Sequence, residues 1–130
     1  PPITLRALGL CCGTYDLKKG ISEAKGRGLL REYLTGKPFQ FGKMLDVLEH
    51  ITGEYPPVYM FSSHGDFLVE ECGIMAEFLN GKGVLCRHKI YGTEQTGHVF
   101  HVDMNDAFGA EANEEQVAFF REVLNGKEKR

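Results

Sequence analysis

The fold is decided by residues 56–83, which read PPVYMFSSHGDFLVEECGIMAEFLNGKG. Their apolar run 58–62 follows two prolines and predicts a strand, and residues 69–80 predict a helix. The apolar stripe expected on this helix consists of Leu68, Cys72, Met75 and Leu79. Residues 85–91, LCRHKIY, predict a further strand that lies near an edge of the sheet, because its apolar and polar residues alternate imperfectly. A strand, a helix and a strand in this order favour parallel pairing through a right-handed crossover.

The flanking sequence extends this pattern on both sides. Residues 3–12, ITLRALGLCC, form a mostly apolar run that predicts a buried strand of a parallel sheet. Residues 17–54 are rich in glycine and lysine and contain two short helical patterns, so we expect an excursion over the sheet. Residues 92–106 predict a loop, and residues 114–125 predict the last helix.

Capping residues set the expected ends of the helices. Asn80-Gly81 and Asn125-Gly126 each predict a helix end. Asn113 predicts an N-cap for the last helix, with Gln116 completing a pattern like a capping box. The buried stripe expected on that helix consists of Val117, Phe120 and Leu124.

These elements predict an α/β protein in which residues 1–130 form one domain, with about three mainly parallel strands and flanking helices. In open parallel sheets, chemistry lies at the carboxyl ends of the strands. Asp66 follows the strand at 58–62, and His98 follows the strand at 85–91. We therefore expect both side chains on the same rim of the sheet.

An acid and a base in this arrangement suit acyl transfer. A triad aspartate needs a short, fixed loop from which its carboxylate orients an imidazole and stabilises the imidazolium. Asp66 sits between a glycine turn and a helix, which offers such a loop. A triad histidine needs a loop after the next strand, and His98 stands there between Gly97 and an apolar segment.

The same residues resemble a known family. Pro56-Pro57, a strand, Gly65-Asp66-x-Leu68, a helix ending at Gly83, a strand and Gly97-His98-x-Phe100 are similar to the end of the α/β-hydrolase esterases and lipases. The first strand with Tyr15-Asp16 resembles acetyl-esterase-like members. The resemblance implies a partial α/β-hydrolase fold, Asp66 as the catalytic acid, His98 as the general base and residues 17–54 as a lid-like excursion.

The family's nucleophile is not evident in this sequence. The family order is serine, acid, histidine, with the serine in a G-x-S-x-G elbow. No such elbow occurs: Ser22 lacks the second glycine, and Ser63 lacks the first and follows the bulky Phe61. The oxyanion-hole run is also missing. The resemblance therefore implies a carboxylic-ester hydrolase fragment that supplies the acid and base, lacks the nucleophile half and is inactive alone.

Other assignments of the same residues stay open. Ser63 stands at a strand-to-helix turn, as an elbow serine would, and His101 competes with His98 as the base. His64, Asp66, His98 and His101 together offer the ligands of a metal-dependent hydrolase. The leading hypothesis needs no cofactor.

Composition excludes several classes of partner. The 130 residues carry a net charge of −3, which gives no electrostatic case for binding nucleic acid or an anionic membrane. No apolar run approaches the ~18 residues that span a bilayer. We expect Cys11, Cys12, Cys72 and Cys86 to be reduced and mostly buried in a cytoplasmic protein.

The expected partners follow from the hypothesis. The substrate is a small-molecule ester, and the chain associates with a missing N-terminal half or forms a homo-oligomer through an exposed sheet edge. The alternative to an enzyme is a non-enzymatic interaction module built on a hydrolase remnant.

Overall fold

The computed structural model describes residues 3–16 and 47–126. Its three strands form one sheet in the order β1-β2-β3, with every neighbouring pair parallel. Strand β1 spans Leu8–Cys11, β2 spans Val58–Ser63 and β3 spans Cys86–Tyr91. The predicted α/β class, with three parallel strands and flanking helices, is confirmed.

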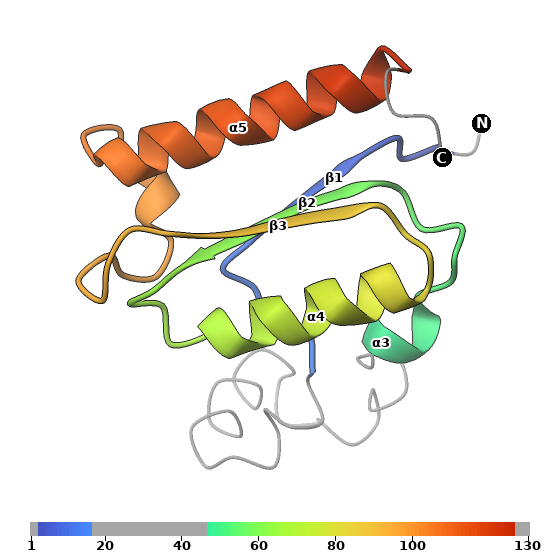
Figure 1. The fold of residues 1–130 in the computed structure, drawn as a ribbon, viewed down its shortest axis with the longest axis horizontal. Coiled ribbons are helices and arrows are strands. Elements are labelled where there is room, and N and C mark those ends of the chain that lie inside the picture. The colour runs from blue at the N-terminus through green and yellow to red at the C-terminus, as the bar shows by residue number, and fades with distance from the viewer. Residues whose placement is uncertain (1–2, 17–46, 127–130) are drawn as a thin grey trace.

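Helices cover both faces of this sheet. Helix α5 (Ala107–Leu124) lies on one face, and α4 (Val69–Gly81) lies on the other beside the short α3 (Val47–His50), as Figure 1 shows. A 3-10 helix, η2 (Phe100–Val102), lies within the loop expected at 92–106. The lid-like excursion predicted at 17–54 falls outside the described residues except for 47–54, where Ile51 is buried in the core.

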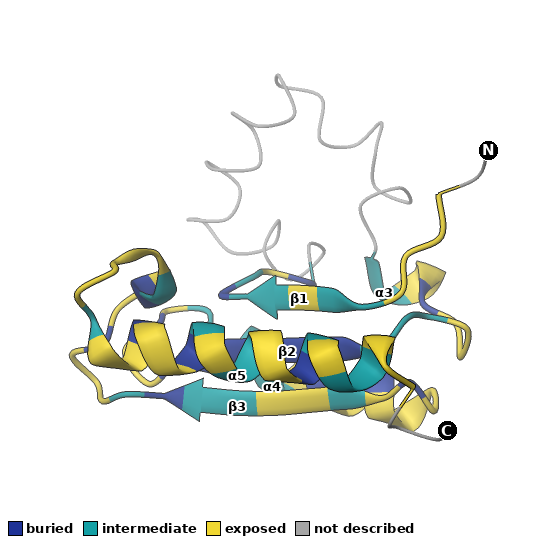
Figure 2. Cartoon of the chain, turned by 90° about the horizontal axis from the view of Figure 1, so that it is seen from above, coloured by how far each residue is buried: buried dark blue, intermediate teal, exposed yellow. Residues whose placement is uncertain are grey.

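Strand β2 is the centre of the molecule, and all six of its residues are buried (Figure 2). Because side chains alternate along a strand, Val58 and Met60 pack into the cluster under α4, whereas Tyr59 and Phe61 pack into the cluster under α5. A strand covered on both faces has no polar side, which explains why 58–61 read as a continuous apolar run.

The first strand is shorter and less buried than predicted. Pairing with β2 begins at Leu8, opposite Val58, so residues 3–7 of the predicted strand have no strand partner in the described chain. All four β1 residues are partly or fully exposed, because β1 is an outer strand of the described sheet. The expectation of a buried strand over 3–12 was therefore wrong in extent and in burial.

Helix α4 follows the sequence prediction closely. Cys72, Met75 and Leu79 of the expected stripe are buried, together with Ala76. The helix continues one residue past the predicted stop and includes Gly81. It is closed by Gly83, whose φ of +78° is accessible to glycine at little cost, and by the Val84 amide, which donates to Leu79 O at 3.0 Å.

Helix α5 begins seven residues earlier than predicted. Its N-cap is Asp106, whose carboxylate accepts from the Gly109 amide at 2.8 Å, and Asn113 lies inside the helix. Asn113 Nδ2 instead donates to His101 O at 2.9 Å and joins α5 to η2.

The predicted stripe of α5 was wrong at Val117 and Leu124, whereas Phe120 packs against the core cluster under this helix. Val117 and Leu124 are 44% and 47% exposed, and Phe120 is only half-buried. The buried residues are Gly109, Ala112 and Phe119.

Candidate active site

The loops after β2 and β3 are joined at the carboxyl rim of the sheet. The His64 amide donates to Tyr91 O, and the Gly65 amide donates to Thr96 O, both at 3.1 Å. The Ser63 hydroxyl is fully buried and donates to Thr96 O at 2.7 Å and to Gly97 O at 3.0 Å. These bonds fix the loop that carries Asp66 against the loop that carries His98. They also bury Ser63, which disfavours it as a nucleophile.

Asp66 is a buried and fully hydrogen-bonded carboxylate. Its Oδ2 accepts from the Ser62 hydroxyl at 2.5 Å, and its Oδ1 accepts from the Leu68 amide at 2.9 Å. Burial raises the pKa of Asp66, but the hydrogen bonds from Ser62, Leu68 and His98 outweigh it and hold that pKa below its ordinary value. The group is therefore an anion at neutral pH.

His98 contacts this anion directly. Its Nδ1 lies 2.9 Å from Asp66 Oδ1, although 32 residues separate them in sequence. A carboxylate only accepts hydrogen bonds, so the contact places a proton on Nδ1 and leaves Nε2 of the neutral ring free to accept one. The His98 side chain is 34% exposed and the Asp66 side chain is 0% exposed, so the imidazole reaches solvent while the carboxylate lies buried behind it.

An exposed aromatic ring covers one side of His98. The Phe67 ring lies 4.7 Å from the imidazole, between ring centroids, and Phe67 is 79% exposed. Its position directly after Asp66 brings an apolar surface beside the candidate base.

The other two rim histidines lie elsewhere. His101 packs edge-on against Phe61 and Phe100, and its Nδ1 is buried without a hydrogen-bond partner within residues 3–16 and 47–126. Burial, and secondarily the charge of His98, lowers the pKa of His101, so its ring is neutral. His64 is exposed in the loop after β2.

The four-residue metal set predicted from His64, Asp66, His98 and His101 is not assembled. In the described part of the chain, potential metal-ligand atoms cluster instead on Cys12, Asp66 and His98, within 4.8 Å of one another. Sequence reasoning placed Cys12 in the core and missed this proximity. Burial raises the pKa of the Cys12 thiol to about 11, with the neighbouring Asp66 acting in the same direction.

The cysteines otherwise agree with the sequence prediction. All four are free thiols, with Cys12 and Cys72 buried and Cys11 and Cys86 half-buried. Burial raises the pKa of each of them above the ordinary thiol value, so all four are protonated at neutral pH.

Two supporting residues were also missed. Ser62 holds Asp66, and a serine pair inside an otherwise apolar strand was its sequence signal. Glu71 on α4 accepts from the Tyr15 and Asp16 amides at 3.0 Å and so anchors the segment after β1. Its signal was a carboxylate in the first turn of the helix that follows Asp66.

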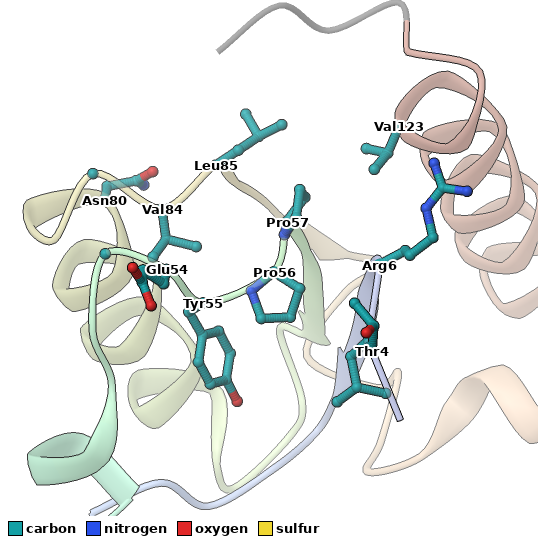
Figure 3. Close-up of a pocket in the computed structure, with 13 residues that line it drawn as sticks. Thr4, Arg6, Glu54, Tyr55, Pro56, Pro57, Asn80, Val84, Leu85 and Val123 are labelled. Carbon is teal, nitrogen blue, oxygen red and sulfur yellow. The ribbon is translucent and has the colours of Figure 1, made fainter. Parts of the chain in front are cut away.

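A separate open groove lies at the other end of the sheet. Its lining includes Arg6, Glu54, Pro57 and Leu85, and Figure 3 shows these residues around the start of β2. Neither Asp66 nor His98 lines it. The groove therefore does not belong to the candidate site.

The fold defined by these elements is a partial α/β-hydrolase fold, and solved structures confirm this prediction. Esterase B from Lactobacillus rhamnosis matches with a TM-score of 0.75 and 16% identity, over 93% of this chain and 41% of the esterase. A C6-C4 SN3 inhibited form of the same esterase matches with a TM-score of 0.74 and 17% identity, over 93% and 42%. Esterase 2 from Thermogutta terrifontis, with propionate bound, matches with a TM-score of 0.66 and 23% identity, over 91% and 43%.

The chain thus spans about two fifths of each esterase. At these identities the likeness establishes the fold. No protein-family model matches the sequence, and no curated protein matches it. Among residues 3–16 and 47–126, no helix combines the length and the apolar character needed to cross a membrane.

Proposed function

We propose that this chain is the acid- and base-bearing part of a serine-type carboxylic-ester hydrolase. The observation that carries the proposal is the 2.9 Å contact between the His98 imidazole and the buried Asp66 carboxylate at the carboxyl rim of a parallel sheet. The nucleophilic serine and the oxyanion donors come from a segment outside these 130 residues, so the chain is inactive by itself.

In the proposed reaction, His98 Nε2 takes the proton of the serine hydroxyl as the serine attacks the ester carbonyl. The same nitrogen then returns that proton to the leaving alcohol. Asp66 keeps the other imidazole proton on Nδ1 and stabilises the imidazolium that forms between the two steps. Water, activated by His98 Nε2, then attacks the acyl-serine, the carboxylic acid leaves and the serine hydroxyl is restored, so the reaction requires no cofactor.

The proposed substrate is an ester with a short acyl chain. The structural neighbours include an esterase inhibited by a tributyrin phosphonate and an esterase with propionate bound. The exposed Phe67 ring beside His98 adds an apolar surface next to the reacting atoms, which suits a small acyl or aryl group.

The test joins the chain to a preceding segment that carries a G-x-S-x-G elbow and oxyanion donors, and assays hydrolysis of a short-chain aryl ester. We expect His98→Ala and Asp66→Asn each to lower kcat by about 10²–10⁴, the range for loss of general base catalysis or of its orienting carboxylate. His64→Ala is the matched control, because it removes an exposed histidine from the same rim. Undiminished hydrolysis by His98→Ala contradicts the proposal.

A further inference from the structure

Three residues with different metal-binding atoms converge at the rim from the ends of three neighbouring strands. Cys12 directly follows β1, Asp66 follows β2 and His98 follows β3. A thiol sulfur, a carboxylate oxygen and an imidazole nitrogen from these residues lie within 4.8 Å of one another. We propose that they form a binding site for a thiophilic divalent cation, with Zn²⁺ as the fitting ion.

The donor set favours zinc over harder cations. Zinc binds cysteine sulfur, histidine nitrogen and aspartate oxygen at about 2.0–2.3 Å, whereas Mg²⁺ and Ca²⁺ take oxygen ligands. Tetrahedral ligands at those distances lie about 3.3–3.7 Å apart. This spacing lies between two values seen in the structure. His98 Nδ1 and Asp66 Oδ1 are 2.9 Å apart, and the ligand atoms of all three residues lie within 4.8 Å of one another. Small side-chain movements at these three residues would complete the geometry.

The surroundings hold these ligands in place and leave a route of entry. The Ser62 hydroxyl fixes the second carboxylate oxygen of Asp66 at 2.5 Å, as the supporting hydrogen bonds of metal ligands do. Cys12 is 4% exposed and the His98 side chain is 34% exposed, so a cation enters from the imidazole side. Water from that side supplies the fourth ligand.

Backbone conformation singles out the same place. In the described part of the chain, the non-glycine residues with positive φ are Cys12, at 50°, and Val99, at 54°. One is a proposed ligand and the other directly follows a proposed ligand. Non-glycine residues rarely adopt this conformation, and such residues concentrate at ligand-binding and catalytic sites.

Cation binding would change which atoms of the site carry protons. The Cys12 thiol loses its proton to solvent and binds as a thiolate. His98 Nδ1 exchanges its proton for the metal, and the neutral ring then carries its proton on Nε2. An imidazole in that tautomer cannot accept a proton from a serine hydroxyl, so the bound cation would inhibit the hydrolase. This last consequence rests on the proposed function, whereas binding itself does not.

The test of binding uses the 130-residue chain and Co²⁺ as a coloured substitute for Zn²⁺. We expect Co²⁺ to produce a thiolate-to-cobalt charge-transfer absorption that Zn²⁺ abolishes by competition and an equal concentration of Mg²⁺ leaves unchanged. Cys12→Ser should lose the absorption. Cys11→Ser, which removes the adjacent thiol near Gln116, should keep it. Matching far-ultraviolet circular dichroism spectra establish that both variants fold.

His98→Gln provides a second variant at a solvent-accessible side chain. We expect it to raise the Kd for Co²⁺ at least about tenfold. Removal of even a supporting contact of a metal ligand lowers metal affinity by about that much. Absence of the absorption in the unsubstituted chain, or its persistence in Cys12→Ser, overturns the site. Equal loss in Cys11→Ser also overturns it.

Inhibition is tested separately in the longer polypeptide that carries the nucleophile. Zn²⁺ should lower its esterase rate, and Cys12→Ser should be at least about tenfold less sensitive, relative to its own metal-free rate. Cobalt binding without any esterase activity refutes the proposed function and leaves the metal site standing. Esterase activity without cobalt binding refutes the metal site alone.

Discussion

At the scale of single residues, two glycines of the rim, Gly65 and Gly97, differ in how closely their surroundings pack. A Cβ on Gly65 would overlap the carbonyl oxygens of Glu94 and Thr96, at 2.6 Å from the latter. A Cβ on Gly97 would meet nothing within 4 Å. The sequence motif presents both glycines as framing the acid and the base, but the packing of the two loops requires only the glycine before Asp66.

Gly65→Ala is therefore expected to destabilise the protein by about 1–3 kcal/mol, because backbone carbonyls must move to admit the methyl group. Urea denaturation measures the change in the free energy of unfolding. Gly97→Ala is the matched control and should change it by less than about 1 kcal/mol. Equal changes in the free energy of unfolding for the two substitutions would show that the close contact at Gly65 does not account for the loss of stability.

At the scale of elements, α5 is attached to the sheet by a polar network. The Tyr59 and Tyr91 hydroxyls lie 2.6 Å apart, and they donate to Glu115 Oε2 at 2.9 and 2.7 Å. Lys89 Nζ lies 2.6 Å from the other oxygen of the same carboxylate and 2.9 Å from Glu111. One glutamate on the helix thus serves three partners on the two strands beneath it.

The hydrogen bond from Lys89, supported by the hydrogen bonds from Tyr91 and Tyr59 and by the charge of Lys89, lowers the pKa of Glu115 from 4.5 to about 2. A depressed pKa in the folded state stabilises the protein above the unfolded value near 4.5, and this stabilisation is lost as the pH falls towards 2. Glu115→Gln should therefore lose less stability than the unsubstituted chain between pH 5 and about pH 2.5.

Urea denaturation across this pH range measures the difference. Glu114→Gln removes a neighbouring exposed carboxylate of α5 that lies outside the network, so it controls for the change in net charge. Parallel pH dependences for Glu115→Gln and the unsubstituted chain would contradict a role for this network in acid stability.

The start of α5 shows why that element was misjudged. The sequence pattern predicted Asn113 as the N-cap, whereas the helix begins two residues before Gly109, a residue type that disfavours helices. In the structure, Gly109 lets the helix approach η2, since a Cβ there would lie 2.8 Å from Phe100 O. Gln116 further obscures the stripe, because this polar residue faces β1 and donates to Cys11 Sγ at 3.5 Å.

At the scale of the whole molecule, the described sheet ends at β1 on one side, with the half-buried Leu8, Leu10 and Cys11. An outer strand of this kind pairs readily with another strand. We predict that the chain by itself dimerises, a second copy pairing along β1. Cytoplasmic location likewise stays a prediction from the four thiols.

Multi-angle light scattering across a range of protein concentrations measures the mass of the particle. We expect twice the 14.6 kDa of the chain at high concentration. The chain joined to the proposed nucleophile-bearing segment serves as the control and should remain monomeric. A monodisperse 14.6 kDa particle at every concentration would contradict pairing through β1.

The sequence alone determined the parallel α/β arrangement, because apolar runs, helical periodicity and turn residues are local properties that residues 56–91 express without ambiguity. It also placed Asp66 and His98 after neighbouring strands, and parallel pairing then puts such residues on one rim. Only the tertiary structure decided that His98 rather than His101 contacts the acid, that Ser62 holds the carboxylate and that Cys12 joins them. Those contacts cross between loops and strands distant in sequence, and loop conformation and packing, which carry no periodic pattern, set their distances.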